Sequence, residues 1–134
     1  MERKLVISLV FLLATVLNNV SGQDLKLNDL GYFETQGVNV LVYSNQFTGG
    51  FNDEKNAGIE LIHHGVRTAQ GGAVRLSGTP EQWDLVPAMP ARKADPVSKT
   101  IEVGLRFDDY DFDSRVIVTA KGNGVEISVY LDKP

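Results

Sequence analysis

Apolar and polar residues alternate with a period of two in the last third of the chain. Every second position is apolar in residues 101–107 and again in residues 125–131. Between them, residues 115–119 (RVIVT) are rich in β-branched side chains. Such alternation is typical of strands with one buried face. Residues 121–124 (KGNG) are a strong hairpin signal, because Gly and Asn accept positive φ. The pattern predicts a three-stranded antiparallel meander.

The first half of the chain also predicts strands. In residues 38–44 (VNVLVYS) the valines lie on one face, whereas Leu41 and Tyr43 lie on the other, so this strand is expected to be buried on both sides. Residues 59–63 and 73–76 are shorter candidates, separated by glycines. No long 3.6-residue period follows the first 22 residues. The chain therefore predicts an all-β fold, an antiparallel β-sandwich.

One stretch interrupts this rhythm, residues 77–98, which contain four prolines. Within it, Thr79-Pro80-Glu81-Gln82 fits a helix start, with Thr79 as N-cap and proline at the first helical position. Pro87 limits that helix to one or two turns. We expect a short helical turn near residues 79–86, as an excursion across the sandwich rather than a domain boundary.

The first 22 residues have the features of a secretory signal peptide. A basic start (MERK) precedes an uncharged apolar run, Leu5 to Leu17, and the small-residue pattern Val20-Ser21-Gly22 follows. The run is shorter than the ~20 apolar residues that span a bilayer. The sequence thus predicts residues 1–22 as a cleaved leader and residues 23–134 as one exported domain, periplasmic or extracellular, with no membrane span after cleavage.

Charge and cysteine content narrow the class of partner. The formal net charge is −4, and removing the leader makes it more negative, since the leader holds two basic residues and one acidic residue. Nucleic acids and anionic membranes select basic patches, so both are disfavoured, whereas neutral sugars are not. The chain has no cysteine. It must therefore fold without disulfides, and it has neither a thiolate metal site nor a lipoprotein anchor.

An acidic segment is the one candidate for a metal site. Its three aspartates have the D-x-D-x-D spacing that opens many Ca²⁺ loops: Asp109, Asp111 and Asp113. Ser114 stands where the turn glycine of such a loop belongs, and no glutamate closes the loop. The alternative is a solvated edge: if the segment is extended, Tyr110 and Phe112 pack inward and the carboxylates face water.

No catalytic constellation is visible in the sequence. His63 and His64 are adjacent, so in a strand they point to opposite faces and do not readily share one metal. No G-x-S-x-G or phosphate-binding loop occurs. The available carboxylates show no glycosidase-like setting.

Aromatic residues give two further interpretations. The lone tryptophan, Trp83, could form a sugar-stacking platform together with Tyr32, Tyr43 or Phe51. It could equally plug the end of the sandwich or dock on a neighbouring domain, which is the interpretation that we favour, because one Trp buries a large area.

Several segments resemble the N-terminal region of exported bacterial proteins classed with glycoside hydrolase family 9. They cover most of the chain after residue 22: LKLNDLGYFE (25–34), VNVLVYSNQF (38–47), DEKNAGIELIHHGVRTAQGGAVRL (53–76), TPEQWDLVP (79–87), DYDFDSRVIVT (109–119) and GVEISVYLDKP (124–134). The resemblance implies a β-rich accessory region that precedes an immunoglobulin-like domain and a helical barrel. In that family the barrel carries the catalytic acids for inverting hydrolysis of β-linked glucans.

On this resemblance the catalytic acids would lie beyond Pro134, and no catalytic residue can be assigned within this chain. The expectation is a non-catalytic β-sandwich, truncated at its C-terminus, that packs against the downstream immunoglobulin-like and catalytic domains and positions them. A free-standing carbohydrate-binding module, with a polysaccharide as its partner, is the alternative. A complete small enzyme is a third and weaker reading, because no acid–base pair is visible.

Overall fold

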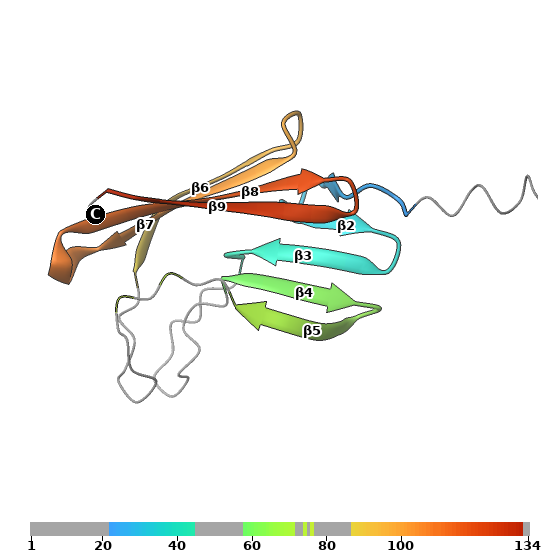
Figure 1. Ribbon diagram of the computed structural model, residues 1–134, viewed down its shortest axis with the longest axis horizontal. Coiled ribbons are helices and arrows are strands. Elements are labelled where there is room, and N and C mark those ends of the chain that lie inside the picture. The colour runs from blue at the N-terminus through green and yellow to red at the C-terminus, as the bar shows by residue number, and fades with distance from the viewer. Residues whose placement is uncertain (1–21, 45–57, 72–73, 75, 77–86, 133–134) are drawn as a thin grey trace, which may run out of the picture.

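The described part of the chain is an all-β sandwich. The computed structural model describes residues 22–44, 58–71, 74, 76 and 87–132. These residues form two antiparallel sheets and one short 3-10 turn (Figure 1). The predicted fold class is confirmed. The predicted helical turn at residues 79–86 and nearly all of the leader lie outside the described residues.

The first sheet has the strand order β1-β2-β3-β4-β5. Its strands are β1 (Lys26–Leu27), β2 (Phe33–Thr35), β3 (Val38–Val42), β4 (Ile59–His63) and β5 (Val66–Gly71). The strands predicted at 38–44 and 59–63 are therefore present. The strand predicted at 73–76 is not observed at Val74 and Leu76, which lie outside any strand. β5 occupies the preceding segment instead, and every one of its residues is exposed.

The second sheet has the order β6-β7-β8-β9. Its elements are β6 (Ala88–Asp95), β7 (Thr100–Phe107), the 3-10 turn η1 (Asp108–Tyr110), β8 (Phe112–Lys121) and β9 (Gly124–Leu131). The predicted meander corresponds to β7, β8 and β9. β6 was not predicted, because its segment is rich in proline. Pro90 is tolerated there because β6 is an edge strand with a register shift between Ala88 and Ala91.

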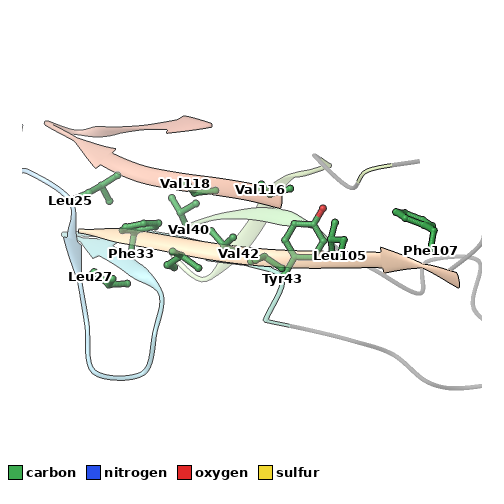
Figure 2. Packing of buried hydrophobic residues seen from close by; sticks show 12 residues of the cluster. Leu25, Leu27, Phe33, Val40, Val42, Tyr43, Leu105, Phe107, Val116 and Val118 are labelled. Carbon is green, nitrogen blue, oxygen red and sulfur yellow. The ribbon is translucent and has the colours of Figure 1, made fainter. Parts of the chain in front are cut away.

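The core lies between the facing sides of the two sheets (Figure 2). The buried apolar residues are Leu25, Leu27, Phe33, Val40, Val42, Tyr43, Ile101, Val103, Leu105, Phe107, Val116 and Val118. Burial of each large apolar side chain stabilises the fold by about 1.5–3 kcal/mol. The first-sheet members come from β1–β3 and the segments beside them, and the second-sheet members come from β7 and β8.

Tyr43 departs from the prediction. The alternation in residues 38–44 places it on the face opposite Val42, yet it joins the same core (Figure 2). β3 ends at Val42, and Tyr43 has φ 45°, which turns its side chain back between the sheets. The positive φ at the end of the strand is what the period-two pattern could not show.

Arg92 of β6 joins the two sheets. It pairs with Val103, so it points into the sandwich. Its Nε donates to the carbonyl of Val42 at 2.9 Å, and its Nη2 donates to the carbonyl of Gly31 at 2.5 Å. Continuing the β2–β3 register beyond Phe33 and Val40 would make Gly31 and Val42 the second pair along. The guanidinium thus binds one carbonyl just before β2 begins and one at the end of β3.

Candidate functional site

The outer face of the second sheet carries a row of residues from all four strands. Alternate residues of β7 and β8 are buried, so those between them point away from the core. The strand register places Ala91 opposite Gly104, Gly104 opposite Arg115, and Arg115 opposite Tyr130. Glu102 lies on the same face of β7, two residues from Gly104. We call these five residues the outer platform.

The polar groups of the outer platform are already oriented. The Arg115 guanidinium carbon lies 4.9 Å from the centroid of the Tyr130 ring, as a cation–π pair. Arg115 Nη1 also donates to Glu102 Oε1 at 3.4 Å. All three side chains remain accessible, with Arg115 51% and Glu102 43% exposed in their side chains and Tyr130 50% exposed.

Two members of the outer platform, Ala91 and Gly104, have small side chains or none and leave open space above the sheet. A Cβ built on Gly104 would have no neighbour closer than 3.9 Å, the nearest atoms belonging to Ala91 and Pro90. Small residues beside an exposed aromatic ring and two charged groups leave room for a flat polar ligand. Such a surface can stack on a pyranose ring and exchange hydrogen bonds with its hydroxyls.

A second polar cluster surrounds Arg106, the next outward residue of β7 after Gly104. Its guanidinium binds three carboxylates at 3.2, 2.5 and 2.7 Å: those of Asp108, Asp111 and Asp113. These hydrogen bonds, led by the one to Asp111, raise the pKa of Arg106 above its ordinary value. Two of the three aspartates in the predicted Ca²⁺ loop, Asp111 and Asp113, thus hold an arginine.

The conformation of the 108–113 segment also differs from the extended alternative. Asp108–Tyr110 forms a 3-10 turn, and Asp111 follows in the left-handed region at φ 49°. The segment is therefore not extended, and Tyr110, which would pack inward in an extended segment, is 59% exposed. Phe112 is half-buried, and its ring centroid lies 6.1 Å from that of Phe107. Ser114 is buried in β8.

No group of three or more His, Asp or Glu side chains in the part of the chain that the structure describes could hold a metal ion. For Asp109 in particular, the structure gives no hydrogen bond or ion pair. The Ca²⁺ interpretation of Asp109, Asp111 and Asp113 stays a prediction.

His63 and His64 contact each other, with ring centroids 4.3 Å apart in an edge-to-face arrangement. They do not point to opposite faces of a strand, because β4 ends at His63 and His64 has φ 48°. The His64 ring packs over Gly37, whose φ of 76° and missing side chain leave space for it. The pair packs the β2–β3 turn against the β4–β5 turn.

The predicted aromatic platform is not assembled by the described residues. Trp83 and Phe51 lie outside them. Tyr43 is 2% exposed; burial raises the pKa of its phenol, and its oxygen accepts a hydrogen bond from the Val74 N–H at 3.3 Å. Tyr32 is half-buried in the turn before β2, where its N–H donates to Asn28 Oδ1.

The sequence analysis did not identify the outer platform, although two features of the sequence indicate part of it. The alternation in residues 125–131 already places Tyr130 on the solvated face. The hairpin at residues 121–124 fixes the β8–β9 register, and this register places Arg115 beside Tyr130.

No helix among the described residues is long and apolar enough to cross a membrane. In comparisons with known proteins, no family model, no curated protein and no solved structure matches the chain.

Proposed function

We propose that this chain is a non-catalytic β-sandwich module of an exported polysaccharide-degrading protein of the glycoside hydrolase family 9 type, which packs against and positions downstream domains. The sequence resemblance motivates this proposal, and the all-β fold is compatible with it. The segments that carry the resemblance include β3, β4, β5, most of β8 and all of β9.

One observation carries the packing role. β4 and β5 extend beyond the part of the first sheet that faces the second sheet (Figure 1). By register, Leu61 and Val66 share the core-facing side of the first sheet with Val38 and Val40. Leu61 is nevertheless 37% exposed and Val66 is 64% exposed. Apolar side chains left open on this side provide a docking surface for a neighbouring domain.

The test is made on the natural gene product. Sequencing the gene past codon 134 first asks whether further domains are encoded; a stop codon directly after Pro134 refutes the module proposal. If the frame continues, Val66→Lys in the full-length protein is expected to lower the melting temperature of the downstream domain. Val97→Lys is the matched control, because Val97 is 94% exposed in the β6–β7 turn. Equal effects of both variants contradict docking at β4–β5.

A second candidate function, a free-standing carbohydrate-binding module, is favoured by the outer platform. The platform presents one aromatic ring and two charged groups beside the small residues Ala91 and Gly104, supplied by Tyr130, Arg115 and Glu102. Binding to an insoluble β-glucan is expected to weaken in Tyr130→Ala and to survive in Tyr110→Ala, which changes a somewhat more exposed tyrosine on η1.

Trp83→Ala separates the two aromatic hypotheses. Loss of binding in this variant alone assigns the sugar to the predicted Trp83 platform, whereas loss in Tyr130→Ala alone assigns it to the outer platform. Absence of binding to any polysaccharide rejects the carbohydrate-binding candidate.

A further inference from the structure

β9 is an edge strand, and most of its core-facing side is exposed. The register places Val129 opposite Val116 and Ile127 opposite Val118 on the same face of the sheet. Val116 and Val118 are fully buried, whereas Ile127 is 49% and Val129 is 51% exposed. The first sheet therefore covers β8 but leaves the core-facing side of β9 open beyond Val125, which still packs against the core. Leu131, on the same side of β9, is 57% exposed.

The backbone of β9 has hydrogen-bonding groups directed away from β8. The N–H of Asp132 donates to the carbonyl of Asp113 at 3.1 Å, which makes these two residues a hydrogen-bonded pair of the ladder. In an antiparallel ladder such pairs alternate with non-hydrogen-bonded pairs. Even-numbered β9 residues therefore bond to β8, and the N–H and C=O groups of the odd-numbered residues, 125 to 131, point to the open edge.

Nothing in β9 blocks addition of another strand. Edge strands are usually protected by proline, bulges or several charges. β6, at the other edge of the same sheet, has both Pro90 and a register shift. β9 (GVEISVYL) contains no proline and one charged residue, Glu126, and its register with β8 is unbroken from the Lys121–Gly124 pair to the Ser114–Leu131 pair.

We propose that β9 is a dimerisation edge, at which a second copy of this chain pairs antiparallel about a two-fold axis through Ser128. This register places Ile127 opposite Val129 of the other copy and Val125 opposite Leu131. These are the odd-numbered residues, so their free N–H and C=O groups meet in hydrogen-bonded pairs. The two four-stranded sheets become one eight-stranded sheet.

The two faces of β9 make this edge self-complementary, which is why a second copy fits it. On the core-facing side, branched apolar residues meet branched apolar residues. On the outer side, Glu126, which Lys121 of its own chain binds at 2.6 Å, lies opposite Tyr130 of the other copy, and that ring carries the guanidinium of Arg115. Each copy supplies one Lys121–Glu126 ion pair and one arginine–tyrosine pair, so both charged groups keep the partners that they have within their own chain when the two copies meet.

The test is sedimentation velocity on the purified chain from low micromolar to near millimolar concentration. A concentration-dependent dimer is expected. Val129→Pro removes an N–H that faces the open edge while leaving the bonds to β8 intact, and it should weaken the dimer by about 100-fold. Ile127→Lys is a second variant with the same expectation, should Val129→Pro not fold; far-UV circular dichroism and urea unfolding verify the fold of both.

Val66→Lys, on the other exposed edge strand β5, is the control and should leave the dimer unchanged. The proposal is overturned if the wild-type chain stays monomeric at the highest concentration, which would leave β9 to a strand of a different protein. It is also overturned if the wild type forms open-ended aggregates rather than a closed pair, if the dimer survives both β9 variants, or if Val66→Lys abolishes it.

Discussion

Arg92 provides the most direct test of how the two sheets are held together. Its side chain crosses from β6 to the first sheet and donates to the carbonyls of Val42 and Gly31. Arg92→Met removes both donors while keeping an unbranched side chain that replaces the aliphatic stem of the arginine. We expect this change to destabilise the fold, because the carbonyls of Val42 and Gly31 lie beyond the last β2–β3 pair and would lose the donors that Arg92 supplies.

The magnitude follows from opposing contributions. A hydrogen bond from a charged donor contributes about 1.5–3 kcal/mol, and a buried carbonyl left without a donor costs about 1–3 kcal/mol. Against this, taking the guanidinium out of water is unfavourable, which is also why burial lowers the pKa of Arg92. Methionine avoids that desolvation and gains apolar contact. Arg92 is only half-buried, so water can reach part of the site, and we expect a net loss of about 2–4 kcal/mol.

The assay is urea unfolding of the wild-type chain, Arg92→Met and Arg92→Lys, followed by circular dichroism. Lysine keeps the charge but lacks the fork that reaches both carbonyls, so its loss should be about half that of methionine. Arg115→Met, on the outer face of β8, is the control and should change the free energy of unfolding by less than about 1 kcal/mol. If Arg92→Met is as stable as the wild type, desolvation outweighs the two hydrogen bonds and the reasoning is refuted.

Three further predictions concern the core and two titrating groups. Val116→Ala should lower the free energy of unfolding by about 2–3 kcal/mol, whereas Val129→Ala, opposite it on the same face but 51% exposed, should lower it by less than about 1 kcal/mol; equal losses in urea unfolding would mean that β9 is covered. Asp95 accepts hydrogen bonds from the Ser98 hydroxyl and the Val97 N–H, which hold its pKa below the ordinary 3.8. Its contribution to stability is therefore present above the unfolded-state pKa and is lost as pH falls through the folded value. An NMR titration of the Asp95 carboxyl with a midpoint at or above 3.8 contradicts this. Burial raises the pKa of Tyr43 above 10.0, so the neutral phenol contributes stability below the unfolded-state pKa, and that contribution is lost as pH rises through the folded value. In an alkaline absorbance titration, Tyr43→Phe should remove the tyrosine that ionises at the highest pH. If the variant instead lacks a tyrosine that ionises at an ordinary pH, the assignment is refuted.

The sequence predicted the strands whose side chains alternate and missed those whose side chains do not. β3, β4, β7, β8 and β9 follow from their apolar positions. β5 (VRTAQG) is exposed on both faces, so no hydrophobic period marks it. β6 points a charged residue, Arg92, into the sandwich and contains Pro90, and both features argue against a strand when only the sequence is read.

Only the part of the candidate site that a short hairpin places in register could be predicted from the sequence. The hairpin between β8 and β9 fixes Arg115 beside Tyr130. The pairing of Gly104 with Arg115 depends instead on the η1 turn and on Asp111 in the left-handed region, which the sequence did not reveal. Sugar-stacking residues were sought among Trp83, Tyr32, Tyr43 and Phe51 because they are aromatic, not because any register brings them together.

The alternation along a strand identifies a face, but the opposite sheet decides whether that face is covered. Val116 and Val129 show this, since they share a face and a residue type and differ in burial. The first sheet covers β7 and β8, and two apolar strips stay open, one on β4–β5 and one on β9. We assign the first strip to a neighbouring domain and the second strip to a second copy. The two assignments are independent, so Val66→Lys and Ile127→Lys should each disturb one assembly and spare the other; a single assembly lost in both variants would contradict the division.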